Sequence, residues 1–317
     1  MLSEGNSFSA LQKNLELAYS NNVDDQEVAA MNLAKLVGST MVPTVSFAPL
    51  AHALCKLLPS PNMNVAKYAA SATKILLLED SLRPQVNVAG LPTVICSAVK
   101  SWEDELSCLR ELLAALQTLC WDKNCIRSVI QADKETITHL IDYIQASDQE
   151  VAVLALSSLC NILAFCDTIL LQEDVIIDSL KPAMPILLEI CNLALERPQK
   201  FYAAAAIANA AAHPRLAEEL LEEGGLLVCR ELEAQSISHL HIMGSRLGDC
   251  AQTALYLLSN GEEGERTYAD AKYSFKWGTQ PTMDLQLVSF DRHNRLFVVC
   301  ACVWVMMMIY TFSPALF

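Results

Sequence analysis

The sequence is poor in glycine and in aromatic residues, and both shortages restrict its fold. Only 10 glycines occur among 317 residues and aromatic residues make up 7% of the chain, whereas apolar residues make up 53%. An all-β fold of this length needs many tight turns, for which glycine is a main turn residue. A chain dominated by leucine and alanine favours close-packed helices instead. We therefore expect an all-α protein with enough apolar material for a continuous core.

Basic residues are also scarce. The chain has 22 Lys and Arg against 36 Asp and Glu, which gives a formal net charge of −14. A body this acidic repels a phosphate backbone, so we expect no binding to nucleic acid. The negative charge would attract basic segments of other proteins, or it serves only to keep the protein in solution.

The motifs that mark common enzyme and cofactor sites are missing. The scattered glycines form neither G-x-G-x-x-G nor a Walker pattern, and there is no G-x-S-x-G. His239 and His241 are too close to share one side of a helix, and Cys120 and Cys125 have no second pair at zinc spacing. We expect no catalysis, no cofactor, no metal and no small-molecule ligand, although distant residues can still meet in a fold.

Twelve cysteines are present, but most of them stand inside apolar helical runs, where cysteine behaves as a small buried hydrophobe. The first ten residues are polar and lack the apolar core of a secretory signal. Both observations favour a reduced, cytosol-facing protein.

A repeat with a period near 40 residues runs through the chain. The five letters DQEVA that begin at Asp25 return at Asp148, an offset of 123, which is three times 41. Segments that begin at Asn62 and Glu103 fill the interval, and apolar residues at helical spacing follow each of these starts. Acidic residues at helix starts suit the positive end of the helix dipole.

A second landmark precedes the other long helix of each repeat. It is VNVAGLPTV around Gly90 and LLEEGGLLV around Gly224, with a degenerate copy, VIQAD, at 129–133. A short helix must end and reverse sharply there, and glycine adopts the required positive φ at no steric cost. Pro92 then occupies the first turn of the next helix, where its missing N–H costs nothing.

Together these landmarks resemble the armadillo repeat, in which a short helix, a glycine turn and two longer helices recur. The stretches HPRLAEELLEEGG at 213–225 and WDKNCIRSVI at 121–130 are especially similar to the linker and first helix of that family. HEAT repeats are the alternative, but the glycine turn favours armadillo. The resemblance implies an all-α, right-handed armadillo/HEAT-like helical solenoid of about six repeats over residues 7–260, with a C-terminal hydrophobic helix.

The resemblance also implies a concave groove that binds a protein or peptide. In that family the third helix of each repeat lines the groove, and our candidates for these helices are Ala48–Leu58, Leu91–Lys100, Glu135–Gln145, Pro182–Leu195 and Leu226–Glu233. Members that carry nuclear-import signals clamp the peptide backbone with a ladder of asparagines and stack basic side chains on neighbouring tryptophans. Asn161 and Asn209 match the asparagines, whereas Gly38, Ile75 and Leu116 take the corresponding positions in other repeats and no tryptophan follows.

A nuclear-import carrier is therefore not the favoured hypothesis. The simpler interpretation of Asn161 and Asn209 is that each bonds a backbone carbonyl near a turn, with no ligand. His139, Asp142 and Tyr143 share one helix at spacings that could face the groove and contact a partner. The alternative is that they form a solvated helix face.

The repeat pattern stops after Asn260. Residues 261–295 read as a linker, and the alternation of apolar residues over 272–290 fits a β-hairpin or an irregular tail equally well. Leu296–Phe317 contains 22 residues without a charge, and as a helix it would be about 33 Å long. With Arg292 and Arg295 before it, this segment resembles a C-terminal membrane anchor that leaves the solenoid in the cytosol. The alternatives are a capping helix, a buried strand or a tail without a role.

The favoured hypothesis is thus a non-catalytic scaffold or adaptor that docks a protein segment along a groove, with or without an anchor to a membrane through its tail. The alternative is a soluble carrier or regulator, of a basic peptide or a small GTPase, whose tail is a folded cap.

Overall fold

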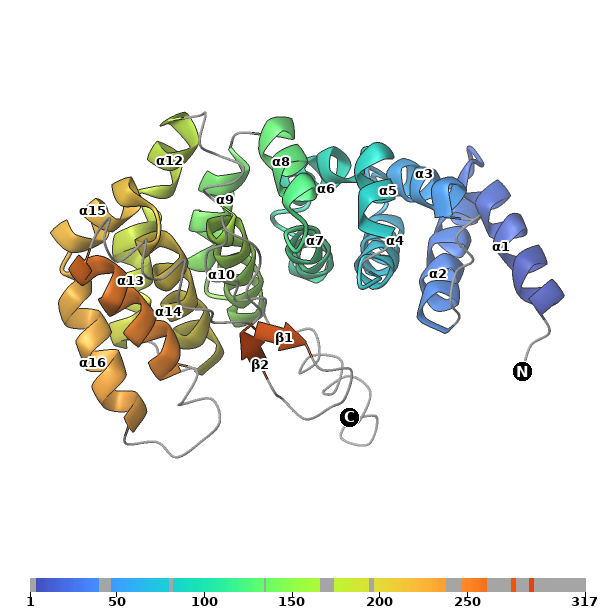
Figure 1. Cartoon of the computed structure of the whole chain (residues 1–317). Coiled ribbons are helices and arrows are strands. Elements are labelled where there is room, and N and C mark those ends of the chain that lie inside the picture. Colours follow the sequence, from blue (N-terminus) through green and yellow to red (C-terminus); the bar gives the residue numbers. More distant parts are fainter. Residues whose placement is uncertain are drawn as a thin grey trace, which may run out of the picture. The chain divides into compact units, whose positions relative to one another are not determined.

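The computed structural model describes residues 4–39, 47–79, 82–133, 135–165, 174–193, 197–237 and 247–260, and two short strands. The chain divides into two compact units, Met1–Ser158 (unit 1) and Leu159–Phe317 (unit 2), and the division falls inside one helix, α10. Each unit is built from repeats of a first, a second and a third helix, and the third helices are the longest (Figure 1).

In unit 1 the helices are α1 (Glu4–Ala18), α2 (Val23–Ser39), α3 (Phe47–Leu57), α4 (Met63–Leu76), α5 (Arg83–Val88), α6 (Leu91–Ser101), α7 (Leu106–Leu119), α8 (Lys123–Ala132), α9 (Thr136–Ile144) and the start of α10 (Gln149–Ala164). The described helices of unit 2 are the rest of α10, α12 (Asp174–Leu180), α13 (Ala183–Leu193), α14 (Arg197–Ala211), α15 (Pro214–Glu222), α16 (Gly225–Ile237) and a further helix over 247–260.

The helix boundaries follow from local sequence. Asn62 caps α4 by accepting hydrogen bonds from the backbone N–H groups of Asn64 and Val65, and Asp122 caps α8 in the same way. Such caps satisfy N–H groups that have no partner inside the helix. The expected glycine turns are present, because Gly90 and Gly224 both have a φ of 82°. Each turn reverses a first helix into a second helix.

The core of each unit consists of leucine, isoleucine and alanine side chains between the helix layers. Leu54, Leu57 and Leu112 in unit 1 are fully buried, and burying each leucine stabilises the fold by roughly 1.5–3 kcal/mol. In unit 2 the alanines of α14 from Ala203 to Ala206 are almost completely buried. Their small side chains allow α13 to pack closely along α14.

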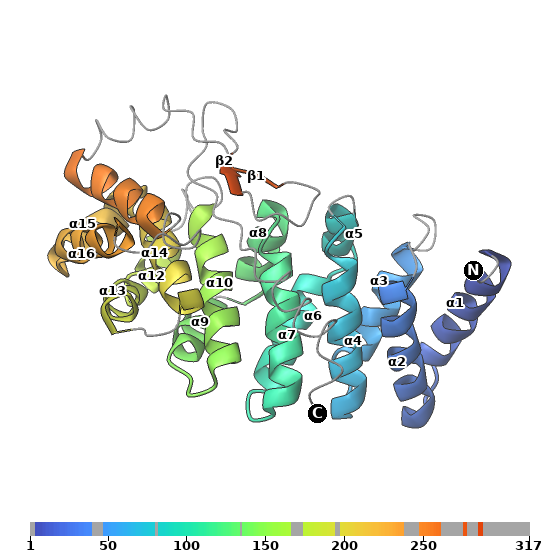
Figure 2. The same ribbon diagram turned by 90° about the horizontal axis from the view of Figure 1, so that it is seen from below.

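The third helices of unit 1 form the more tightly stacked layer. Helix α2 lies along α4, and α4 along α7, in far more extensive contact than the second helices α3 and α6 make with each other (Figures 1 and 2). Closer stacking in one layer bends a row of repeats toward that layer. The inner side of unit 1 is therefore lined by α2, α4 and α7.

This arrangement corrects the expectation about the groove. The helices over 48–58, 91–100 and 135–145 are α3, α6 and α9, which belong to the second-helix layer, so the prediction that they line the inner side of unit 1 was wrong. The stretches 182–195 and 226–233 correspond to the second helices α13 and α16 of unit 2.

Two short strands follow the helices, β1 (Phe275–Trp277) and β2 (Leu285–Leu287). They pair antiparallel, with Phe275 opposite Leu287 and Trp277 opposite Leu285, inside the range where alternation suggested a hairpin. The proposed anchor, Leu296–Phe317, lies outside the described residues. Within the described part of the chain, every helix is too short or too polar to cross a bilayer.

Candidate partner-binding face

Asn161 and Asn209 lie at equivalent positions of two third helices in unit 2. Asn161 on α10 is 1% exposed, and Asn209 on α14 is 2% exposed. Nδ2 of Asn209 donates a hydrogen bond of 3.1 Å to the carbonyl oxygen of Cys160 and lies 3.6 Å from the Cys160 sulfur. This contact joins α14 to α10 next to Asn161.

The two amides differ in how well they are satisfied. Among the residues that the structure describes, neither Nδ2 nor Oδ1 of Asn161 has a hydrogen-bond partner, and Oδ1 of Asn209 also lacks one. The expectation that each asparagine bonds a backbone carbonyl thus holds for Asn209 and fails for Asn161. A buried polar group without a partner costs about 1–3 kcal/mol, so most such groups in proteins are paired.

The structure also corrects the register of this position in unit 1. Helix α7 begins at Leu106, and its first buried residue is Cys108. The first buried residue of α10 is Val151, so we align Cys108 with Val151. Ten residues further on, Thr118 corresponds to Asn161, so the assignment to Leu116 was two residues out. The Thr118 hydroxyl donates to the carbonyl oxygen of Ala114, within its own helix.

One further asparagine was missed in the sequence. In the helix over 247–260 the first buried residue is Cys250, and Asn260 follows ten residues later. Asn260 is exposed, and its Nδ2 donates to the carbonyl oxygen of Tyr256. It could have been predicted from the sequence, because Asn161 and Asn260 both end the order Leu-x-Asn after a run of apolar residues at helical spacing.

In unit 1 the polar residues of the third helices bind one another between repeats. Nδ2 of Asn64 on α4 donates to Glu27 on α2 at 3.0 Å. Lys74 on α4 pairs with Glu111 on α7 at 2.8 Å.

The next contact in the same series joins α7 to the start of α10. Arg110 pairs with Asp148 and, at 3.2 Å, with Glu150. The hydrogen bond from Arg110 holds the pKa of Asp148 below its usual value, whereas burial raises the pKa of Glu150. These contacts fix the register between neighbouring repeats.

The residues expected to contact a partner on α9 do not act as one group. His139 and Tyr143 are half-buried and line a pocket of about 10 Å³ with Cys96 of α6, room for about one water molecule. Asp142 is exposed and is not part of this pocket. Burial, followed by the charges of Glu103 and Asp142, raises the pKa of Tyr143, so its hydroxyl stays protonated at neutral pH.

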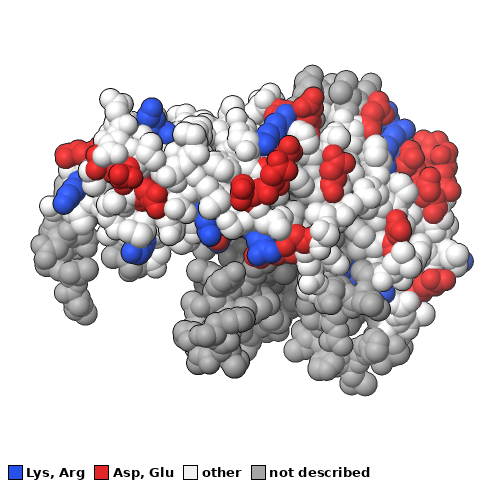
Figure 3. Space-filling model, turned by 180° about the vertical axis from the view of Figure 1, so that it is seen from behind, with Lys and Arg blue, Asp and Glu red and all other residues white. Residues whose placement is uncertain are grey.

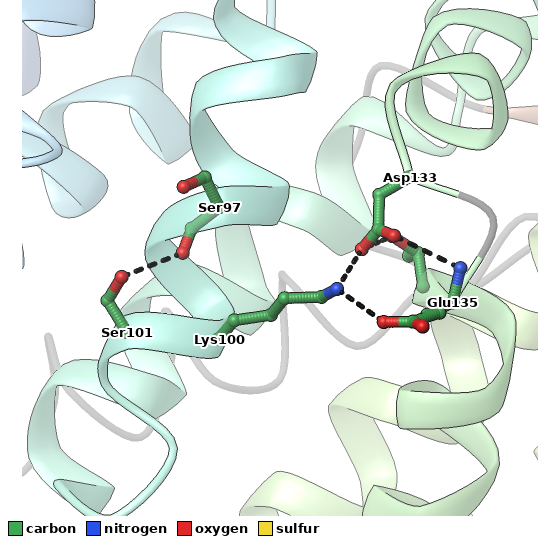
Figure 4. A network of polar contacts seen from close by, with 6 residues as sticks. Ser97, Lys100, Ser101, Asp133 and Glu135 are labelled. Carbon is green, nitrogen blue, oxygen red and sulfur yellow. Dashed lines mark hydrogen bonds and ion pairs between the residues drawn. The ribbon is translucent and has the colours of Figure 1, made fainter.

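An ion-pair network at this pocket joins α6 to the residues between α8 and α9 (Figure 4). The ammonium of Lys100 lies 3.0 Å from a carboxylate oxygen of Asp133 and 2.9 Å from one of Glu135. Burial raises the pKa of Asp133, but hydrogen bonds from Lys100, the Glu135 N–H and Thr136 outweigh it and hold the pKa below its usual value. The Lys100 network positions α9 rather than presenting free charge to a partner.

The cysteines of the described residues support packing. Nine are present as thiols, eight of them buried. Burial raises the pKa of Cys96 to about 11 and that of Cys229 to about 12, so these thiols are protonated and unreactive at neutral pH. Among the described side chains, no three His, Cys, Asp or Glu residues come close enough together to hold a metal ion.

Solved structures similar to this chain include designed armadillo repeat proteins. One was computationally designed as an armadillo repeat protein for modular peptide recognition. It is 20% identical, with a TM-score of 0.64, over 78% of this chain and 99% of its own. A second designed armadillo repeat protein has a TM-score of 0.65 at 20% identity, over 78% of this chain and 99% of its own.

An engineered protein from the Northeast Structural Genomics Consortium is 22% identical, with a TM-score of 0.64, over 79% of this chain and 97% of its own. No protein-family model and no curated protein sequence matches this chain. The fold is an armadillo-type helical repeat. The expected all-α armadillo-type fold is thereby confirmed, whereas the expected C-terminal hydrophobic helix lies outside the described residues.

Proposed function

We propose that this chain is a non-catalytic scaffold that binds an extended protein segment across the third helices α10 and α14 of unit 2. The observation that carries the proposal is the pair of buried asparagines, Asn161 and Asn209, at equivalent positions with unpaired amide atoms among the described residues. An asparagine side chain offers one acceptor and two donors. It can therefore pair with both the N–H and the C=O of one residue of a bound main chain.

It is favourable to replace the side chains packed over these asparagines by a bound main chain, because the amides then gain hydrogen-bond partners. Both asparagines are almost fully buried in the chain alone, so a ligand reaches them only by displacing side chains packed over them. The unpaired amide atoms gain partners in return, and a buried unpaired polar group costs about 1–3 kcal/mol. The similar structure designed for peptide recognition has the same fold, which supports peptide binding as the use of this face.

The test uses a randomised peptide display library selected on the protein, after which the selected peptides are labelled and titrated by fluorescence anisotropy. The variant carries both Asn161→Leu and Asn209→Leu, because leucine has the same branching and number of side-chain heavy atoms as asparagine. We expect it to bind at least about tenfold more weakly, since about 1.4 kcal/mol corresponds to tenfold.

The matched control is Asn124→Ala, which removes an exposed asparagine side chain from α8 in unit 1. This variant should bind with unchanged affinity. The proposal is wrong if the library yields no binder, or if the selected peptides bind the double leucine variant as tightly as the original protein.

A membrane location is a separate proposal that rests on the sequence alone. The uncharged run Leu296–Phe317, preceded by Arg292 and Arg295, is long enough for one helical span. Alkaline extraction of the full chain and of a version that ends at Phe290 tests it. Only the full chain should stay with the membrane pellet, and equal extraction of both would contradict the anchor.

A further inference from the structure

A cleft of about 340 Å³ opens on the second-helix layer of unit 2, between α13 and the start of α16. Its apolar lining includes Pro185, Leu188 and Leu193 of α13 and Val228 of α16. Two carboxylates, Glu189 and Glu223, line the same cleft. It involves neither Asn161 nor Asn209.

Large apolar side chains stand exposed around this cleft. Leu193, which lines it, is 68% exposed, and Leu227, next to Val228, is 63% exposed. Leu221, at the end of α15 just before the Gly224 turn, is 43% exposed. An apolar cleft with exposed leucines beside it is a typical feature of an interaction surface.

The charge around the cleft is strongly negative. Helices α15 and α16 with the turn between them carry six glutamates and two arginines, and one of these, Arg215, pairs with Asp178 at 2.6 Å. Glu189, Glu222 and Glu223 are exposed and take part in none of the ion pairs among the described residues. Figure 3 shows acidic side chains gathered over the α15–α16 end of unit 2. This potential attracts basic ligands and repels anionic lipid surfaces.

We propose that this cleft docks a basic amphipathic helical segment of another protein. Two large apolar side chains of the segment, one helical turn apart, fill the space beside Leu188, Leu193 and Val228. Its lysines or arginines lie against Glu189 and Glu223. Burial of the leucines supplies affinity, and the glutamates select a basic segment and speed its association.

The probe is a labelled synthetic peptide with leucines at positions i and i+4 flanked by lysines, titrated by fluorescence anisotropy at low and moderate salt. The variant Leu193→Ser with Leu227→Ser should weaken binding at least about tenfold, because it makes polar one leucine that lines the cleft and one exposed leucine next to Val228. The variant Glu189→Gln with Glu223→Gln should weaken binding and reduce its dependence on salt.

Val88→Ser is the matched control, because Val88 in unit 1 is 89% exposed and lies outside the cleft. It should leave binding unchanged, as should a peptide competitor whose lysines are replaced by glutamate. All substituted residues are exposed, so the variants should fold, which circular dichroism checks. Equal binding by the original protein and the leucine variant would overturn the proposal.

Two further results would overturn it in distinguishable ways. If the Asn161→Leu/Asn209→Leu protein loses the peptide and the Leu193→Ser/Leu227→Ser protein does not, the peptide occupies the α10–α14 face instead. If sedimentation velocity shows that the original protein self-associates through Leu193 and Leu227 and does not bind the peptide, the cleft is a contact between copies of this chain.

Discussion

Replacing Asn161 by leucine should stabilise the protein, which is the opposite of what most substitutions in a core do. Asn161 is 1% exposed, and neither its Nδ2 nor its Oδ1 has a partner among the described residues. Leucine keeps the branching and the number of side-chain heavy atoms while removing both unpaired polar groups. Since each such group costs about 1–3 kcal/mol, and some of the gain is lost to imperfect packing, we expect an increase of about 2 kcal/mol in the free energy of unfolding.

Asn209→Leu provides the internal comparison. Its Nδ2 donates to the carbonyl oxygen of Cys160 at 3.1 Å, so the substitution removes a hydrogen bond worth roughly 0.5–1.5 kcal/mol along with one unpaired oxygen. The two effects oppose each other. We therefore expect Asn209→Leu to change stability much less than Asn161→Leu does.

The assay is urea unfolding followed by circular dichroism, with the midpoint and the slope reported for each variant, since a repeat array can depart from two-state behaviour. For a chain of 317 residues, this gain should also raise Tm by roughly 3 °C in Asn161→Leu. If Asn161→Leu instead lowers the free energy of unfolding, its amide is paired in the folded protein. Asn161 would then have no unpaired amide to offer a ligand.

Three more expectations concern backbone, charge and thiols. Gly90→Ala should destabilise the fold by about 1 kcal/mol, because the φ of Gly90 is 82°. Gly38→Ala should stabilise the fold by about 0.5–1 kcal/mol, because Gly38 is helical and an added Cβ would meet only an ordinary van der Waals contact. Thermal melts that shift in the same direction for both variants would contradict this. The lowered pKa of Asp148 gives stability that is present above its unfolded pKa of about 3.9 and is lost as pH falls through the folded value. Arg110→Ala should therefore make stability fall less steeply at acid pH. An unchanged dependence at acid pH would show that the ion pair does not contribute to stability. Cys229, whose pKa burial raises to about 12, should resist alkylation at about pH 8 until urea unfolds the protein; rapid native labelling, read by peptide mapping, would contradict that burial.

Local features were predicted well because short-range physics decides them. The glycine turns at Gly90 and Gly224 could be located because a sharp reversal needs a positive φ, and both residues have one. The acid at Asp148, predicted near a helix start, accepts a hydrogen bond from the N–H of Val151 in the first turn of α10. Recurrence of the same signals at a fixed period then led to the armadillo-type fold, which the similar solved structures confirm.

The site was predicted less well because it depends on packing between repeats. Spacing on α9 placed His139, Asp142 and Tyr143 in one group, but His139 and Tyr143 line a pocket with Cys96 of α6 and Asp142 does not. The register error that chose Leu116 instead of Thr118 came from an uncertain helix start, which the position of the first buried residue of α7 resolves. Partner binding by any of these residues stays a prediction.

The helices, their turns and their repetition follow from local sequence, since capping, glycine conformation and apolar periodicity act within a few residues of the chain. Tertiary structure decided which helix layer is inside and which polar atoms are left without partners. It placed α2, α4 and α7 on the inner side of unit 1, and in unit 2 it gave Asn209 a carbonyl partner while leaving the amide of Asn161 unpaired among the described residues. The physical reason is that layer curvature and hydrogen-bond satisfaction arise only where helices about 40 residues apart in sequence come into contact.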